Sequence, residues 1–344
     1  MADCVPEWRD FPVWSNVLQL VARVSAVTFI GPALCHDKDW LDLSVHYAVE
    51  AFDCVRALRL WPKLTQPFVH WFLPEFRRLR GRHGQARRII EGEWKRRQLL
   101  SASGKHEVYN DGMQWLHETA KDRPFDRTDS QLTLAFAAIH TTSDLITKVI
   151  FDIAAHPEIL DPLREEMVAA LAGGFTKSAL YNMKLLDSVL KESQRLSPSS
   201  YAPCTRKIDK EFKLSDGTVL PKDAQLAFTA NRNFDASVWP NPDNFNPYRF
   251  LELRNKPGKE NAWQFVTAQV DQLGFGTGQH ACPGRFFASN EAKIALCHLL
   301  LKYDIKLAGA ERPKNMTIGA EIVAPVLDSI RIKRRYDLEA ALLK

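Results

Sequence analysis

The sequence predicts a mainly α-helical protein that carries a small β region. Apolar residues recur at helical spacing from the start of the chain to about Ser197, with breaks at Gly or Pro where loops are expected. After Pro198 this pattern gives way to short segments with alternating apolar residues. The chain has 344 residues, 45% of them hydrophobic and 25% charged, a composition typical of a globular protein. We expect one cooperative domain over residues 1–344.

The expected helices are separated by breaks at Gly31-Pro32, Trp61-Pro62, Leu73-Pro74 and Gly173-Gly174. The most apolar window, residues 13–35, contains Arg23 and the first of these breaks, so it falls short of the roughly 20 uninterrupted apolar residues that span a bilayer. It predicts a buried helix. Since the chain also starts without the basic segment and apolar core of a signal peptide, we expect it not to anchor itself in a membrane.

A basic run lies between Arg77 and Arg97, where the acidic residues along the chain are Glu91 and Glu93. It supplies much of the net charge of +5. Such a run favours either contact with nucleic acid or an acidic membrane, or a solvated helix face. Because the run lacks the aromatic interleaving of single-strand binding proteins, we predict no nucleic-acid partner.

The β region begins with the segment 212–220, in which alternating apolar residues flank Asp216-Gly217, a strong hairpin signal. Residues 239–247 are rich in Pro, Asn and Asp and predict an irregular surface segment. Short extended segments are expected from Thr317 to Arg334, with residues 330–332 as the clearest strand.

The six cysteines are scattered, without Cys-x-x-Cys pairs or zinc-finger spacing, which favours a reducing compartment over a disulfide scaffold; they are Cys4, Cys35, Cys54, Cys204, Cys282 and Cys297.

Cys282 differs from the others because it lies in a Gly-rich loop, within the segment 274–303. Gly278 and Gly284 allow the backbone to approach a flat group closely. Pro283 suits the first turn of a helix, and helical spacing from Arg285 to Tyr303 predicts that this helix begins just behind the sulfur. The helix N-terminus would then stabilise a thiolate, the form of cysteine that binds metals.

The order Phe-x-x-Gly-x-His-x-Cys-Pro-Gly from Phe275 to Gly284 resembles the haem-binding loop of the cytochrome P-450 monooxygenases. The resemblance implies haem b with Cys282 as the thiolate ligand of its iron, and with His280 beside a haem propionate. It also implies that Phe275, Gly278 and Gly284 border the cofactor. The alternative is a buried free cysteine in a Gly-rich loop.

Glu192 and Arg195 lie three residues apart on an expected helix, residues 183–197, so their side chains emerge on the same face. Together with Arg249 they resemble the Glu-Arg-Arg triad of the family. A guanidinium grips a carboxylate with two parallel bonds, so this triad would lock the helix against the segment that precedes the cysteine loop.

The expected helix over residues 129–153 turns abruptly from apolar to small hydroxyl residues. It resembles the distal helix of the family, with Thr141 as the proton-relay hydroxyl and Ala138 where glycine is frequent. His140 replaces the usual acid of the family and would either pass a proton or point away and pack. The alternative for Thr141 is a hydroxyl bonded to the carbonyl one turn back. Arg206 resembles the second propionate partner, although Lys207 could supply the same charge.

The resemblance implies a monomeric haem-thiolate monooxygenase that inserts one atom of O2 into an apolar small molecule. The sequence around Thr141 and Cys282 is similar to that of filamentous-fungal members of the family that act on secondary metabolites such as terpenoids or indole-terpenoids. A Gly-x-Gly-x-x-Gly nucleotide fingerprint is absent from the sequence, so the electrons are expected from a partner reductase, and the resemblance implies that this donor is NADPH-cytochrome reductase.

The resemblance covers the C-terminal two-thirds of the family fold, without the anchor helix and the Trp-x-x-x-Arg motif that precede this part. We therefore expect a cytoplasmic protein or one peripheral at the endoplasmic reticulum membrane. A truncated gene product, a fragment and a shortened isoform all fit this pattern. The alternative function is a truncated, catalytically impaired or non-catalytic haem-binding remnant, because an open distal pocket admits water.

Overall fold

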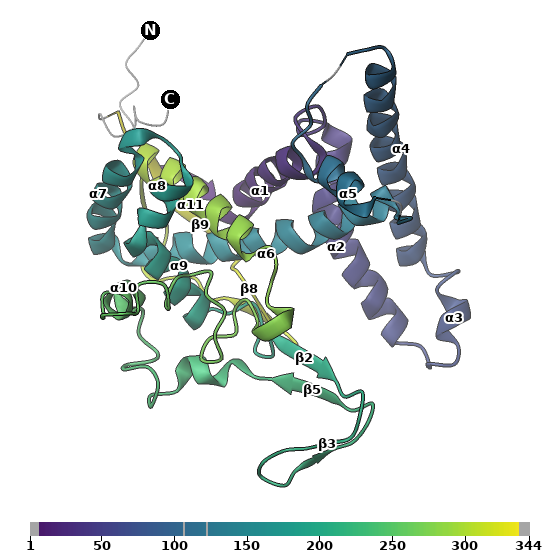
Figure 1. Cartoon of the computed structure of the whole chain (residues 1–344). Coiled ribbons are helices and arrows are strands. Elements are labelled where there is room, and N and C mark those ends of the chain that lie inside the picture. Colours follow the sequence, from purple (N-terminus) through teal and green to yellow (C-terminus); the bar gives the residue numbers. More distant parts are fainter. Residues whose placement is uncertain (1–6, 106, 122, 337–344) are drawn as a thin grey trace. The chain divides into compact units, whose positions relative to one another are not determined.

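The computed structural model describes residues 7–105, 107–121 and 123–336, and it is mainly helical with short antiparallel sheets (Figure 1). The predicted fold class is therefore confirmed. The chain divides into two compact units: one is Asn16–Ser143, and the other joins Met1–Ser15 to Asp144–Lys344. Whether these form one cooperative domain over residues 1–344 stays a prediction.

The unit Asn16–Ser143 is built of helices. They are α1 (Val13–Ile30), α2 (Lys38–Arg59), α3 (Gln66–Val69), α4 (Pro74–Ala102), α5 (Gly112–Ala120) and the first half of α6 (Arg127–Ala155). Helices α2 and α4 pack together over a core that includes Trp40, Leu43, Ile90 and Trp94. The predicted breaks near residues 31, 61 and 73 all fall between these helices, as expected for Gly and Pro.

The basic run lies on α4, and the tertiary structure gives several of its arginines acidic partners from other elements. Arg82 binds Asp42 and Glu50 of α2, with Nη1 at 2.5 Å from Asp42 and Nε at 3.2 Å from Glu50. Arg97 is buried between Glu93 and Asp111, at 2.8 Å and 2.7 Å. The run is thus partly an internal ion-pair network rather than a uniformly solvated face.

Among the described residues two helices, α1 and α6, are long and apolar enough to cross a membrane. Core helices of globular proteins pass the same test, and both contribute buried residues to the core, such as Val21 and Ile30 of α1 and Ile139 and Val149 of α6. Helix α1 covers residues 13–30 of the predicted window 13–35, and side chains such as Leu20 and Val27 are exposed, so the prediction of a buried helix holds for one face only.

The other unit contains the second half of α6, then η1 (Pro157–Ile159), α7 (Leu160–Ala170), η2 (Leu171–Gly173), α8 (Lys177–Asn182), α9 (Lys184–Leu196), η3 (Ala230–Phe234), α10 (Arg249–Arg254), η4 (Gly278–His280) and α11 (Arg285–Lys302). Helix α7 contacts α8, α9 and α11, and α9 contacts α10. Figure 1 shows α9 among these elements, and the residues it buries position the candidate site.

In the part of the chain that the structure describes, four short antiparallel sheets complete this unit. A three-stranded sheet has the order β1 (Arg9–Pro12), β9 (Ser329–Arg334), β6 (Tyr303–Leu307), and the pairs are β2 (Cys204–Lys207) with β5 (Gln225–Phe228), β3 (Phe212–Lys213) with β4 (Val219–Leu220), and β7 (Met316–Ile318) with β8 (Glu321–Val323). The hairpin at Asp216-Gly217 and the strand at residues 330–332 are confirmed. Strands β1 and β6 were not expected, because their pairing with β9 is long-range.

Candidate functional site

Helix α9 is buried along almost its whole length, although many of its side chains are polar. The buried polar residues are Asp187, Ser188, Lys191, Glu192, Ser193 and Arg195, each at most 3% exposed. A buried polar group is tolerated only when it finds a hydrogen-bond partner. These side chains therefore fix other segments of the chain onto α9.

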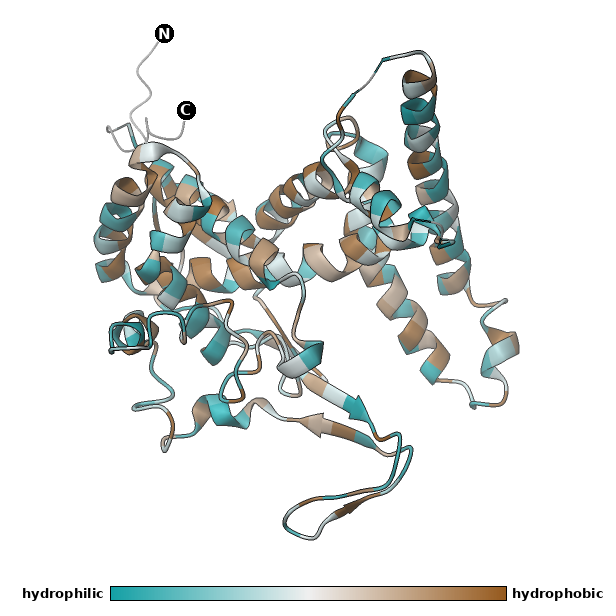
Figure 2. Ribbon diagram, in the orientation of Figure 1, coloured by the Kyte–Doolittle hydropathy of each residue, from teal (hydrophilic) through white to brown (hydrophobic). Residues whose placement is uncertain are grey.

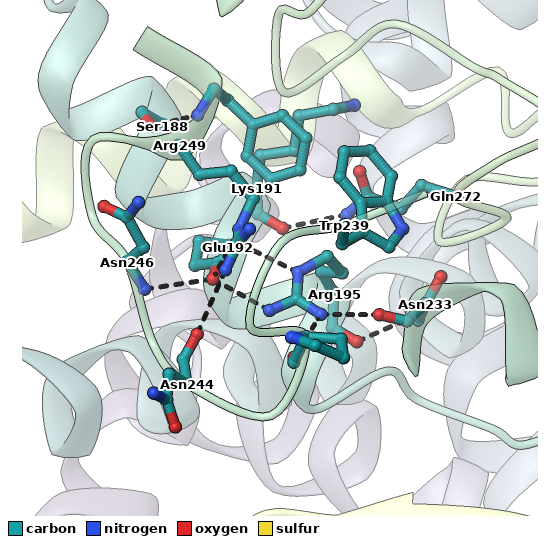
Figure 3. A network of polar contacts seen from close by, with 12 residues as sticks. Ser188, Lys191, Glu192, Arg195, Asn233, Trp239, Asn244, Asn246, Arg249 and Gln272 are labelled. Atoms are coloured by element: carbon teal, nitrogen blue, oxygen red, sulfur yellow. Dashed lines mark hydrogen bonds and ion pairs between the residues drawn. The ribbon is translucent and has the colours of Figure 1, made fainter. Parts of the chain in front are cut away.

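The carboxylate of Glu192 is 0% exposed and accepts hydrogen bonds from two arginines (Figure 3). Arg195 donates through Nε at 2.8 Å to Oε2 and through Nη2 at 2.9 Å to Oε1. Arg249 donates through Nε at 3.1 Å to both oxygens, and the backbone N–H of Asn246 adds a bond of 3.0 Å to Oε1. The structure thus brings the three residues of the predicted triad together.

The remaining guanidinium N–H groups bind backbone carbonyls of the irregular segment before α10. Arg195 Nη1 lies 2.5 Å from the oxygen of Asn233 and 2.6 Å from that of Pro242. Arg249 reaches the oxygens of Pro240, Asn241 and Asn244 at 2.7, 3.3 and 3.2 Å. The ion pairs therefore hold the irregular segment 233–246 against α9.

The segment that leads to Cys282 also rests on α9. Lys191 Nζ donates to the oxygen of Thr267 at 3.2 Å, and Gln272 Nε2 donates to the oxygen of Lys191 at 2.8 Å. Gly274 lies so close that a Cβ there would come within 2.2 Å of the side chain of Gln194. One helix therefore backs both the irregular segment and the cysteine loop.

The cysteine loop folds back on itself through its glycines. Gly276 and Gly278 have φ of +69° and +65°, values that favour glycine. The turn allows the Cys282 N–H to donate to the Phe275 oxygen at 2.8 Å, while Arg285 Nη1 donates to the Cys282 oxygen at 2.7 Å. Both backbone polar groups of Cys282 are thus fixed, which sets the position of its side chain.

Cys282 is half-buried, whereas the other four cysteines within the described residues are buried. Cys4 lies outside the described residues. A metal ligand needs access to its metal, so the exposure of the five described thiols separates Cys282 from the rest.

The surroundings of Cys282 leave space for a bound group. No described atom other than its chain neighbours lies within 4 Å of a Cβ placed on Gly278, and a Cβ on Gly284 would meet the Cys282 sulfur at 3.9 Å. His280 is exposed beside this open face. Among the described residues no cluster of three or more His, Cys, Asp or Glu side chains forms a metal site. A group whose iron needs a single protein ligand is compatible with that arrangement.

The sequence predicted Pro283 in the first turn of the following helix, and this prediction is wrong. Helix α11 begins at Arg285 with Gly284 as its N-cap, so Pro283 precedes the cap and lies in a turn. The helix still begins directly after the cysteine loop, and its N-terminus follows Cys282 by three residues.

Arg206 lies on β2, where alternation places it on the same face as Cys204. The sulfur of Cys204 lies 3.8 Å from the position of a Cβ on Gly276, so this face is turned toward the cysteine loop. Lys207 points to the opposite face and pairs with Asp223 at 2.8 Å on the surface. Of these two cations, Arg206 is therefore the one on the face turned toward the cysteine loop.

In the other unit, α6 is a regular helix through the hydroxyl-rich segment. The Thr141 hydroxyl donates to the Ala137 oxygen at 2.7 Å, which is the backbone contact one turn back, and the residue is exposed. His140 Nε2 lies 2.7 Å from the Val45 oxygen of α2, so in the neutral ring Nε2 carries the proton. Burial lowers the pKa of His140, an effect that its hydrogen bond to the Val45 oxygen partly offsets.

Sequence reasoning missed two further charged residues of α9. Asp187 binds Arg254 and Lys293, and Lys191 sits at 1% exposure against the cysteine loop. Burial lowers the pKa of Lys191 to about 7, with Asp187 opposing and Arg254 adding to the shift. The available signal was that Asp187 and Lys191 share one face of the expected helix with Glu192 and Arg195 of the predicted triad.

Comparison with known proteins identifies the family. The family model described as cytochrome P450 matches residues 36–328. The chain belongs to the cytochrome P450 family. Membership implies haem iron as the cofactor, and the free space beside Cys282 is compatible with it.

Among curated relatives, cytochrome P450 monooxygenase ptmU of Penicillium ochrochloron is 43% identical over 340 residues, and cytochrome P450 monooygenase 1 of Gibberella fujikuroi is 42% identical over 339 residues. Each alignment covers 96% of this chain, and 66% and 77% of the two relatives. The chain therefore spans about two thirds of the length of the first of them. The solved structure titled retinoic acid bound cyanobacterial CYP120A1 matches with a TM-score of 0.72 at 19% identity, over 95% of this chain and 70% of that chain. This likeness supports the cytochrome P450 fold.

Proposed function

We propose that this cytochrome P450 is a haem-thiolate monooxygenase whose iron ligand is Cys282. The observation that carries the proposal is the half-exposed Cys282 thiol on a Gly turn, beside four described cysteines that are buried. The Glu192, Arg195 and Arg249 network supports the same assignment, because it stiffens the helix on which the cysteine loop rests.

In this proposal side chains of the chain would hold haem b. Cys282 would supply the thiolate, His280 and Arg206 would bind the propionates, and Phe275, Gly278 and Gly284 would border the cofactor. When bound, the cofactor supplies reductive activation of O2, with electrons from NADPH-cytochrome reductase and one oxygen atom entering the substrate. Thr141 holds and passes a proton on the distal helix. His140 is bonded to Val45 and stays neutral at pH 7, so its role in this proposal is to pack α6 against α2 rather than to relay protons.

The proposed substrate is an apolar small molecule, a fungal secondary metabolite of the terpenoid or indole-terpenoid class. Its support is the similarity to monooxygenases from the fungi Penicillium and Gibberella. We also propose that the protein acts as a monomer.

The proposed location is peripheral at the endoplasmic reticulum membrane. Between α2 and α4 large apolar side chains stand in solvent, among them Leu64 at 89%, Phe68 at 71% and Phe72 at 78% exposed. Figure 2 shows brown stretches where α2 ends and before α4 begins. Exposed cations, including Arg77 and Arg78, follow directly. An apolar surface bordered by cations suits an anionic bilayer.

Vesicle co-sedimentation tests this location. We expect the protein to bind phosphatidylserine-containing vesicles more tightly than phosphatidylcholine vesicles, and Leu64→Ser with Phe72→Ser to abolish binding. Leu327→Ser is the matched control, since Leu327 is 92% exposed elsewhere. Equal binding by the double variant and the control would refute membrane contact, and a concentration-dependent dimer lost in the double variant would assign the surface to a second copy instead.

The haem-thiolate assignment is tested by expressing the chain with a haem precursor, reducing it and adding carbon monoxide. We expect a red-shifted thiolate-type Soret band that Cys282→Ser removes and Cys54→Ser, a substitution at a buried cysteine of the other unit, retains. A thiolate band without substrate oxidation would favour the non-catalytic haem-binding remnant. An unchanged band in Cys282→Ser would reject Cys282 as the ligand.

A further inference from the structure

Asp187 lies in the first turn of α9 and is 3% exposed, yet its carboxylate joins three separate segments. Oδ1 lies 2.6 Å from Lys293 Nζ, and Oδ2 lies 2.9 Å from Arg254 Nη1. Oδ2 also accepts from the backbone N–H of Phe265 at 2.7 Å. The carboxylate thus connects α9 to α11, to α10 and to the segment that leads into the cysteine loop.

Two of these connections lead to Cys282. The ring of Phe265 packs edge-on against the ring of Phe275, with centroids 4.9 Å apart, and the Phe275 oxygen accepts from the Cys282 N–H. On the other side, Lys293 belongs to α11, the helix that begins three residues after Cys282. The cysteine therefore lies between two segments whose positions Asp187 fixes.

The two sides are also joined to each other close to the cysteine. Arg285, the first residue of α11, donates to the Val266 oxygen at 3.1 Å and to the Cys282 oxygen at 2.7 Å. Val266 follows Phe265, the residue whose N–H binds Asp187. A shift of either segment would thus be transmitted to the backbone of Cys282.

Stability alone explains this arrangement poorly. A buried ion pair is weak evidence for stabilisation, because desolvation of the charges offsets most of their attraction. Its directional bonds instead specify the geometry of the groups that meet there. Arg254 shows the desolvation cost of this arrangement, since its Nη2 is buried and has no hydrogen-bond partner among the described residues.

We propose that Asp187 is a positioning residue that holds α11 and the segment 265–275 in register and so fixes the Cys282 sulfur. This inference rests on the proposed function in one respect, the assignment of Cys282 as the iron ligand. The contacts that carry it belong to the polypeptide and can be probed without haem.

The first measurement is the alkylation rate of the Cys282 thiol in haem-free protein, followed by peptide mass spectrometry. Asp187→Asn keeps the shape of the side chain and removes its charge. Because Cys282 is already half-exposed in the folded protein, its reaction does not require a local opening; we expect it to react about twofold faster in this variant, as the loosened segments expose the thiol more fully.

The matched control is Asp152→Asn. Asp152 is a buried carboxylate, 5% exposed, that binds Arg312 and also contacts α9 through Ser193, away from the cysteine loop. We expect this variant to lower the urea midpoint as Asp187→Asn does while leaving the alkylation rate of Cys282 unchanged. Asp187→Glu, which restores the charge, should recover most of the wild-type rate.

The second measurement uses the Soret absorption of the reduced carbon monoxide complex. It is the ratio of the red-shifted band, which reports a thiolate ligand, to the band at shorter wavelength, which reports its loss. We expect this ratio to fall in Asp187→Asn and not in Asp152→Asn. Equal alkylation rates and equal ratios in the two variants would overturn the inference. Should Asp187→Asn fail to fold, Lys293→Met removes one connection and carries the same prediction. An unchanged thiolate-type band in Cys282→Ser would reject the proposed ligand while leaving the alkylation result to decide the role of Asp187.

Discussion

Replacing Glu192 by alanine removes a carboxylate that two buried guanidinium groups share. Arg195 and Arg249 together donate four hydrogen bonds to it, at 2.8 to 3.1 Å, and Asn246 donates a fifth. Both arginines would remain buried, because their other N–H groups stay bound to backbone carbonyls. Two positive charges would then face each other without compensation.

Removing one partner of a buried ion pair costs about 3–5 kcal/mol, and domains of this kind are stable by about 5–15 kcal/mol. We therefore expect Glu192→Ala to lose a large share of its free energy of unfolding and to release haem. Urea unfolding followed by circular dichroism measures the first effect, and the absorbance ratio of haem to protein measures the second.

The control is Glu252→Gln, at an exposed carboxylate of the neighbouring helix α10, where we expect a change of less than about 0.5 kcal/mol. Full haem occupancy together with a loss below about 1 kcal/mol in Glu192→Ala would refute the reasoning, because a charge pair in water, unlike a buried one, costs that little to break.

Three further predictions concern pH and backbone geometry. The pKa of Lys191 is lowered to about 7 in the folded protein, so the charged side chain costs folding free energy below pH 7, and this cost fades as pH rises toward the unfolded pKa. Lys191→Met should raise the free energy of unfolding, measured with urea, more at pH 6 than at pH 9, by on the order of a few kcal/mol, and an equal gain at both would contradict it. Burial lowers the pKa of His140, so its contribution to stability is lost as pH falls below about 6.5, and His140→Phe should flatten the fall of the urea midpoint between pH 7 and 5. Gly276→Ala should lower the urea midpoint more than Gly278→Ala, since both adopt positive φ but only at Gly276 would the Cβ come within 3.3 Å of the His280 oxygen; equal midpoints would show that backbone strain alone matters.

The candidate site could be predicted from the sequence where its residues lie close along the chain. Glu192 and Arg195 share a helix face, and Cys282 lies within ten residues of Phe275 and Gly284, so local spacing already places them. The helices and their breaks follow the same logic, because Gly and Pro act on the backbone at their own positions.

Residues with long-range partners could not be assigned in this way. His140 could equally have passed a proton or packed, and the Val45 oxygen, 95 residues away in sequence, determines the outcome in the structure. The arginines of α4 have few acidic neighbours along the chain and find them across the fold, as Arg82 does in Asp42.

The sequence by itself determined the fold class, the cysteine loop and the partners of Glu192 on its own helix, because these depend on backbone preferences and on short spacing. Only the tertiary structure decided which cysteine is accessible, which way His140 points and what Asp187 and Lys191 do. The physical reason is burial: the strength of a charge interaction and the pKa of a side chain depend on the surrounding dielectric, and that is set by segments distant in sequence.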